Sequence, residues 1–441
     1  MNLPTRSCFS SRSVISALAA LATFLSILTA TANAQDESQP KAPAGDVESF
    51  VREAIAANRM LRSHLDGVDA ARAAARTKGT LPDPVLGFGY FVETPETRVG
   101  PQESAWTLSQ RIPFPGKLGL ERDIAEKSAG IAEEGYRRRQ IDLRYDVKAW
   151  FYELYAAVNV LDVLEDEVDV LREMENIAQI RYGSGLVRQQ DALKAQLALT
   201  QVDDEIEVAT RRRVTAEAAI RSLLDRSADA DVARPVHGDA PMELPPLERL
   251  TGVALDNRPE IAAADIAAAR AADARALAKR SYWPDLTLGA RYIQVGERDN
   301  VTLDDNGKDV FQVSAAVSIP LWVNRRSAAV RQAKAEASRA HNERAGWETS
   351  IKNQVSEARE RVFVAEERVA LHRDVIIPQA EQTFGASESA YQTGTLDFLG
   401  LLDSERMLLA ARKRYFEVVA DYGAELANLE RTLGVPLGDV R

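Results

Sequence analysis

The side chains that most often perform catalysis or bind metal ions are few and scattered in this chain. Its four histidines are far apart in sequence, and none has the i, i+4 partner of a zinc-binding helix. The single cysteine, Cys8, has no second thiol with which to form a disulfide or a thiolate metal site. Gly183-Ser184-Gly185 lacks the spacing of a hydrolase nucleophile elbow. We therefore predict no enzymatic activity, no cofactor and no metal centre.

The first 34 residues (1–34) have the features of an export signal. An uncharged apolar stretch runs from Val14 to Leu28 and follows two arginines. It is shorter than the roughly twenty residues that a membrane-spanning helix needs. Ala32-Asn33-Ala34 then supplies small residues for cleavage, which we expect after Ala34. Because Cys8 precedes the apolar stretch, we expect no lipid anchor at the cleavage site.

The charge balance argues against one class of partner. The chain has 55 lysines and arginines against 66 aspartates and glutamates, a formal net charge of −11. A nucleic-acid backbone is itself negatively charged, so it would be repelled by this balance. We expect no binding of nucleic acid.

The sequence contains an internal repeat. Three motifs recur in the same order at offsets that grow from 202 to 207 and then 209 residues. They are 81–90 with 283–292, 112–114 with 319–321, and 182–185 with 391–394. The first pair shares Pro, Asp, Leu, Gly and Tyr at matching positions, and the third shares a Tyr-x-x-Gly spacing. Conserved order with growing offsets indicates an internal duplication with small insertions.

Each copy repeats one plan of elements. We expect a linker at 35–45, repeat 1 at 46–240 and repeat 2 at 241–441. The expected elements are first helices at about 46–78 and 259–280, strands at about 84–93, 103–112, 285–295 and 309–320, and long helices at about 117–182, 187–226, 324–386 and 396–433. The strand assignment rests on period-two alternation, clearest where Phe311, Val313 and Val317 alternate with small or polar residues.

The long helices carry apolar residues at alternating steps of three and four, a pattern typical of coiled-coil packing. The stripe in repeat 2 runs through Trp347, Ile351, Val355, Ala358 and Val362. A helix from 117 to 182 would be roughly 100 Å long at 1.5 Å per residue. An ordinary globular domain does not accommodate such a helix.

The strands imply that several chains assemble. Their length of about ten residues suits a tilted strand that crosses a membrane. Four strands cannot close a barrel, and a membrane tolerates no open sheet edge because unpaired backbone groups find no partner there. Two chains would give a barrel of eight strands, too narrow for an aqueous channel, whereas three would give twelve. The long helices would project away from the membrane.

This doubled plan, the Ile112 to Lys117 stretch and the paired Tyr-x-x-Gly turns resemble the TolC outer-membrane efflux family over nearly all of the chain after the signal. The stretch 112–117 is most similar to the heavy-metal branch, the CzcC and CusC type. The resemblance implies a homotrimer with one shared twelve-stranded β-barrel in the outer membrane and a periplasmic α-barrel of long antiparallel helices. It also implies contact with outer-membrane lipid, a periplasmic adaptor and an inner-membrane pump of the RND type.

The resemblance implies a gate at the two turns. In the family an aspartate is tied to the turn tyrosine of repeat 2, and these positions correspond to Asp191 and Tyr391. The arginine that completes the family's latch is replaced by Leu396. Of two constriction aspartates, one corresponds to Asp403, and Asp397 is a candidate substitute for the other. The alternative is that these aspartates are solvated helix residues, with Asp397 favouring a helix N-terminus through the helix dipole.

Three functions remain open at this point. The first is a passive efflux conduit for heavy-metal cations. The second is a conduit of the same fold for drugs or for secreted polypeptides. The third, of a different class, is a periplasmic coiled-coil adaptor or scaffold that never enters a membrane.

Overall fold

The computed structural model of the chain describes residues 45–185, 188–236, 243–300 and 302–440. The predicted export signal, its cleavage site and nearly all of the predicted linker lie outside these residues.

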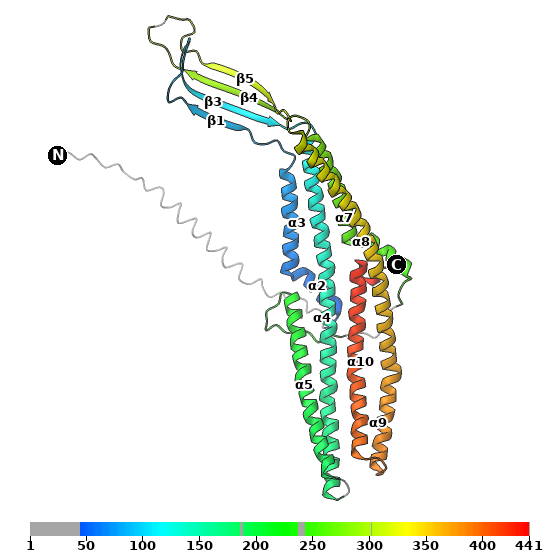
Figure 1. Cartoon of the computed structure of the whole chain (residues 1–441). Coiled ribbons are helices and arrows are strands. Elements are labelled where there is room, and N and C mark those ends of the chain that lie inside the picture. Colours follow the sequence, from blue (N-terminus) through cyan, green and yellow to red (C-terminus); the bar gives the residue numbers. More distant parts are fainter. Residues whose placement is uncertain (1–44, 186–187, 237–242, 301, 441) are drawn as a thin grey trace, which may run out of the picture. The chain divides into compact units, whose positions relative to one another are not determined.

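An antiparallel sheet lies at one end of the helices in residues 45–441 (Figure 1). Its strands are β1 (Val85–Tyr90), β2 (Glu96–Thr97), β3 (Gly100–Ile112), β4 (Leu286–Val295) and β5 (Val310–Val317). The order across the sheet is β1-β3-β4-β5, and the short β2 pairs with β3. Repeat 1 therefore supplies one half of the sheet and repeat 2 the other. The two repeats meet at the β3–β4 pairing, while β1 and β5 are the edge strands.

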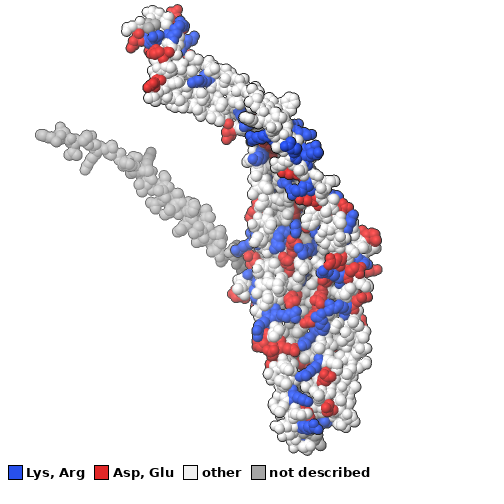
Figure 2. Space-filling view, in the orientation of Figure 1, with Lys and Arg blue, Asp and Glu red and all other residues white. Residues whose placement is uncertain are grey.

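The two faces of the sheet differ in chemistry. The strand registers align one residue from each main strand in a row across the sheet, and one such row is wholly aromatic. It consists of Phe88, Trp106, Tyr292 and Phe311. The two neighbouring rows point to the opposite face, because side chains alternate along a strand. The row on one side contains only small or polar residues, namely Gly87, Thr107, Arg291 and Gln312, and the row on the other side consists of Gly89, Ala105, Ile293 and Val310. The visible surface of the sheet is largely free of charge (Figure 2).

The helices of repeat 1 are α2 (Val47–Ala57), α3 (Arg59–Thr77), α4 (Lys117–Gly183) and α5 (Gln189–Leu223). The expectation of a single first helix at 46–78 was wrong, because the chain breaks at Asn58. The Asn58 side chain accepts a hydrogen bond from the Leu61 backbone N–H (2.9 Å) and donates one to the Leu223 carbonyl (2.9 Å). Asn58 thus caps the new helix and ties it to the end of α5.

The helices of repeat 2 are α6 (Leu247–Asn257), α7 (Pro259–Arg280), α8 (Val323–Leu371), α9 (Ile377–Gln392) and α10 (Phe398–Leu433). A π-helical turn, His372–Ile376, separates α8 from α9, and a 3₁₀ turn, Leu437–Asp439, follows α10. The helix expected to end at 386 continues to Gln392 through this π turn. Pro378 explains the irregularity, because proline has no N–H and its ring crowds the preceding turn.

The helical core consists of three clusters of buried side chains, one mainly within repeat 1, one within repeat 2 and one where α4 and α5 meet α10. The α4 helix packs against α5 of its own repeat and against α10 of repeat 2 (Figure 1). Phe151 and Leu154 of α4 are almost completely buried in the repeat 1 cluster, whereas Leu164 of α4 is buried in the same cluster as Phe398 and Leu402 of α10. We call the β3–β4 pairing together with the α4–α10 packing the inner seam. Within the described residues, no helix is both long enough and apolar enough to cross a membrane.

Candidate functional site at the helical turns

Both Tyr-x-x-Gly motifs form the same turn at the end of a long helix. The Gly185 N–H donates to the Tyr182 carbonyl (2.9 Å), and the Gly394 N–H donates to the Tyr391 carbonyl (3.1 Å). Both glycines have a left-handed backbone, with φ of 74° and 77°. A side chain at either position would be strained, which explains why the motif ends in glycine. The repeated sequence therefore encodes a repeated turn, and both turns lie at the end of the helices away from the sheet (Figure 1).

Arg181 ties the two repeats together at these turns, and the sequence interpretation missed it. From the last turn of α4, its guanidinium donates to the backbone carbonyls of Tyr391 (3.0 Å) and Gln392 (3.2 Å). The guanidinium carbon also lies 4.4 Å from the centre of the Tyr391 ring. This combination of a cation above an aromatic face with two charge-assisted hydrogen bonds binds one turn to the other.

Tyr391 is buried, with 4 % of its surface exposed, and its ring meets Phe398 edge-on at 5.9 Å. Its hydroxyl has no hydrogen-bond partner within the described part of the chain. Asp191 lies in the first turn of α5 and is partly exposed. No hydrogen bond joins the Asp191 carboxylate to Tyr391 among the described residues of the single chain. A buried hydroxyl without a partner is costly, so Tyr391 has capacity for one further hydrogen bond.

The two other candidate aspartates have different environments. The Asp397 carboxylate accepts a hydrogen bond from the Gly400 backbone N–H (3.0 Å), which makes it the N-cap of α10. Asp403, less than two turns further along α10, is exposed, and its carboxylate has no hydrogen bond or ion pair to any described residue. Asp397 is therefore occupied in holding the helix end, whereas Asp403 offers a charge to solvent.

Two acidic side chains are buried further from the turns, at the α4–α10 packing. Glu167 of α4 and Glu405 of α10 are 8 % and 2 % exposed, and one carboxylate oxygen of each lacks a hydrogen-bond partner. Burial, followed by the hydrogen bond and the charge of Glu405, raises the pKa of Glu167 to about 9. Burial also raises the pKa of Glu405. Both shifts favour the protonated carboxyl, because burial disfavours the charged form and two adjacent buried carboxylates repel each other.

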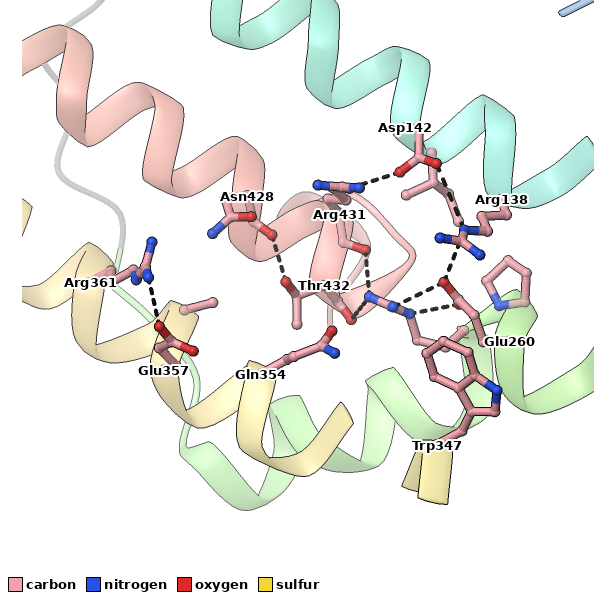
Figure 3. Close-up of a pocket in the computed structure, with 14 residues that line it drawn as sticks. Arg138, Asp142, Glu260, Trp347, Gln354, Glu357, Arg361, Asn428, Arg431 and Thr432 are labelled. Atoms are coloured by element: carbon pink, nitrogen blue, oxygen red, sulfur yellow. Dashed lines mark hydrogen bonds and ion pairs between the residues drawn. The ribbon is translucent and has the colours of Figure 1, made fainter. Parts of the chain in front are cut away.

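A cavity of about 460 Å³ lies elsewhere, between α4, α7, α8 and α10 (Figure 3). Its charged side chains are engaged with one another. Arg258 forms two hydrogen bonds with the Glu260 carboxylate (2.9 and 3.0 Å) and donates to the last carbonyls of α10, and Arg431 pairs with Asp142 (2.8 Å). Arg361 pairs with Glu357 (2.6 Å). The first two sets of contacts connect α4, α7 and α10, and the Arg361 pair lies within α8, so these charged side chains have a structural role.

The described residues contain no group of three or more histidine, cysteine, aspartate or glutamate side chains placed to hold a metal ion. The turns are instead held together by the contacts between Arg181 and Tyr391, and exposed carboxylates lie nearby.

The fold and the paired turns define a class of protein, the outer-membrane efflux channels. The sequence model described as "Outer membrane efflux protein" matches residues 50–226 and 250–435. The chain belongs to this family, as its doubled plan predicts. The two matched segments correspond to the two repeats, and the family is one of channels and not of enzymes.

Particular relatives span nearly the whole chain. The cobalt-zinc-cadmium resistance protein CzcC of Cupriavidus metallidurans is 22 % identical over 399 residues, which are 90 % of this chain and 92 % of CzcC. The solved structure of CusC is 18 % identical with a TM-score of 0.74 and covers 88 % of this chain and 92 % of its own. VceC of Vibrio cholerae is 17 % identical with a TM-score of 0.73, covering 89 % and 96 %. The fold expected from the sequence is thereby confirmed.

Proposed function

We propose that this chain forms the outer-membrane channel of a tripartite efflux system that exports divalent metal cations. In this proposal three copies share one twelve-stranded barrel in the outer membrane, and their long helices form a conduit in the periplasm. A periplasmic adaptor and an inner-membrane pump of the RND type load the conduit. The channel itself is passive.

One observation carries the channel proposal, namely a sheet with two unpaired edges and one exposed apolar face. Phe311 and Val313 of the edge strand β5 are 70 % and 72 % exposed, and Leu86 of the other edge strand is 66 % exposed. Such a sheet is an aggregation hazard in water. In a closed barrel the edges pair with neighbouring copies and the apolar face meets lipid.

The aromatic residues on the exposed face suggest the depth at which the sheet sits. One aromatic row crosses all four main strands, and Trp283 and Trp322 lie 57 % and 72 % exposed at the other end, next to the helices. Aromatic girdles at the two membrane interfaces are typical of outer-membrane barrels. The apolar band between these two levels is where we place the hydrocarbon core.

The turns form the proposed periplasmic gate. We assign Arg181 and Tyr391 the fastening of the closed state, and we assign the Tyr391 hydroxyl a hydrogen bond with Asp191 of its own or a neighbouring copy. Asp403 supplies one carboxylate per copy, so a trimer carries a ring of three. An acidic ring in a narrow passage concentrates cations and repels anions. In this proposal Asp397 contributes to the gate by capping the N-terminus of α10.

The assignment of metal cargo rests on the similarity to CzcC, a cobalt-zinc-cadmium resistance protein that matches nine-tenths of this chain. Deleting the gene in its own bacterium should raise the cell-associated zinc, cobalt or cadmium during growth in those metals. Elemental analysis of washed cells measures this, and re-expression of the chain should reverse it. Unchanged metal content together with lost tolerance to organic drugs would favour the drug conduit instead.

Membrane fractionation distinguishes the channel from the alternative of a periplasmic scaffold. A channel should remain in the outer-membrane fraction through high-salt washing and require detergent for release. Release by salt alone would favour a peripheral scaffold.

A further inference from the structure

The strands β1 and β4 are equivalent in the two repeats but have different neighbours. β4 has β3 on one side and β5 on the other, whereas β1 has β3 on one side and, among the described residues, no partner strand on the other. The free side of β1 corresponds to the side of β4 that faces β3 in the inner seam. Contacts at that seam therefore indicate what the free edge of β1 lacks.

The seam is fastened at Asp285, the residue just before β4. Its buried carboxylate pairs with Arg111 (2.6 Å) and with Lys117 (2.8 Å), and it accepts a hydrogen bond from the Phe114 backbone N–H (2.9 Å). All three donors belong to the segment that leads from β3 into α4. One carboxylate thus holds the start of a strand of repeat 2 to the chain that leaves the sheet in repeat 1.

Asp83 is the counterpart of Asp285 in repeat 1, within the shared Pro-Asp motif. It is exposed, and its carboxylate has no hydrogen bond or ion pair with any described residue. The same residue type at the same position is therefore fastened in one repeat and free in the other. The cause is position, since β1 is the edge strand.

The repeat predicts strand register as well. Equivalent residues of β1 and β4 differ by 202 in number, and those of β3 and β5 by 207. The β1–β3 pair Val85↔Ser109 maps with these offsets onto Thr287↔Ala316, which is a pair of the β4–β5 register. The two halves of the sheet thus have the same register, so the offsets are a sound guide to pairing.

When the same offsets are applied to the β3–β4 pairs of the inner seam, they predict the residue pairs at an interface between two copies. The β3–β4 pair Thr107↔Arg291 becomes Ser314 of β5 opposite Gly89 of β1. Since β1 and β5 are opposite edges of one sheet, this pairing joins two copies. We propose that β5 of one copy pairs with β1 of the next in this register, and that Asp83 is fastened by the Leu321–Arg325 corner of that neighbouring copy. This inference rests on the trimeric channel proposed above.

The corner has the chemistry to receive a carboxylate. Asn324 is the counterpart of Lys117 and offers an amide N–H. The backbone N–H of Leu321, the counterpart of Phe114, already donates to the Ile319 carbonyl (3.0 Å). The charge comes from the next residue, Arg325, which is exposed and has no ion pair in the described part of the chain. Arg326 is already occupied, because it donates to the Ser281 carbonyl (2.8 Å).

Cysteine pairs test the register. In a Cys8→Ser background, Gly89→Cys with Ser314→Cys should link copies spontaneously, because directly opposite residues lie within the reach of a disulfide. A Cβ added at Gly89 meets no atom within 4 Å, so the cysteine fits. The control is Gly89→Cys with Gln312→Cys, two residues out of register and about 7 to 8 Å away on the diagonal.

Non-reducing gels should give linked chains for the first pair and far fewer for the control. Stronger linking of the control, or no linking by either pair in a complex whose mass is that of three chains, would overturn the proposed register. A monomeric mass in detergent would overturn the trimeric channel itself, so the two failures are distinguishable.

A charge swap tests the fastening. Asp83→Arg and Arg325→Asp should each lower the temperature at which the trimer dissociates, and the double variant should recover most of the loss. Glu93→Arg is the control, since Glu93 is exposed in the loop after β1 and should have little effect. A double variant no better than the worse single variant would overturn the Asp83–Arg325 contact.

Discussion

The inner seam and the outer edges of this molecule are built from equivalent segments of the two repeats, which lie in opposite environments. Asp285 is buried among donors at the seam, and its counterpart Asp83 is exposed at the edge. The turn tyrosines differ in the same way, because Tyr391 is 4 % exposed and Tyr182 is 47 % exposed. Sequence alone does not separate the members of either pair. The difference comes from which side of each element already has a neighbour.

This comparison suggests that the contacts between the two repeats within one chain predict the contacts between neighbouring copies of the chain. Some residues on the outer edges keep the type of their seam counterparts, as Asp83 does for Asp285 and Tyr90 for Tyr292, although none of the described residues pairs with these edges. Duplication explains the match, since a contact that once joined two identical copies can become internal after the copies fuse. The following predictions test how far the seam and the edges are equivalent.

The largest expected effect on the free energy of unfolding comes from truncating a buried side chain at the inner seam. Phe398→Ala removes a side chain that is 1 % exposed and packs against Tyr391, and it should cost about 3 to 5 kcal/mol of unfolding free energy. The matched control is Leu399→Ala, since Leu399 is 48 % exposed in the single chain. We expect a loss below about 1 kcal/mol there. Chemical denaturation in detergent measures both, and equal losses would mean that Leu399 is as tightly packed as Phe398.

The next effect is a pH dependence that arises at the seam. An unfolded glutamate has a pKa of 4.5, and the folded chain raises the pKa of Glu167 to about 9, so the folded state binds more protons between these values. Stability should therefore be greatest below pH 4.5 and fall as the pH rises towards 9. Glu167→Gln should flatten this part of the profile, and Glu165→Gln, on the exposed face, should not. Parallel profiles for wild type and Glu167→Gln would contradict the raised pKa of Glu167.

The charged groups around this pair lie on α5 and α10. Those that act on Glu167 and Glu405 are Glu205, Arg406, Arg412 and Lys413. The cations among them oppose the rise in pKa and burial favours it, and burial is the larger influence. Melting temperatures of the detergent complex between pH 4.5 and 9 give the comparison directly.

Loosening the turns should produce a smaller and mainly functional effect. Arg181→Gln removes the stacking on Tyr391 and weakens two hydrogen bonds, contacts worth roughly 1 kcal/mol each. The trimer should remain folded while its single-channel conductance rises. Tyr391→Phe and Asp191→Ala should raise conductance as well if their proposed hydrogen bond closes the gate. Arg188→Gln, an exposed neighbour, is the control, and conductance equal to that of wild type in all variants would place the constriction elsewhere.

The smallest effect is on selectivity. Asp403→Asn removes one exposed carboxylate per copy and should reduce the preference for cations over anions with little change in stability. Reversal potentials in asymmetric salt measure it. Asp204→Asn, an exposed residue of α5 remote from the turns, should leave selectivity unchanged. A selectivity that survives Asp403→Asn would remove this residue from the constriction.

The sequence supported much of the fold because the duplication is visible in it. Two copies of a Pro-Asp motif and of a Tyr-x-x-Gly turn indicate two sets of strands and two helical hairpins. The break at Asn58 was missed because the helical pattern continues through it, and the break depends on a contact with Leu223 far away in sequence. The π turn before Ile377 was likewise hidden, although Pro378 was a signal that could have located it.

The site was less predictable than the fold. Arg181 has Ala390 at the aligned position of repeat 2, so no repeat marks it, and its role depends on packing between α4 and the second turn. Glu167 and Glu405 are ordinary acidic residues of long helices until the helices pair. Asp397 carried a usable signal, since aspartate before an apolar helix is a preferred N-cap.

The mass of the detergent-solubilised complex tests the central claim most directly, that one chain is a third of a channel. The unpaired edges β1 and β5 and the exposed apolar face predict a closed assembly, and twelve strands require three chains. Native mass measurement should give three chains with no smaller species at moderate detergent concentration. A stable monomer would contradict the account, because a sheet with open edges would then persist without the neighbours that its register predicts.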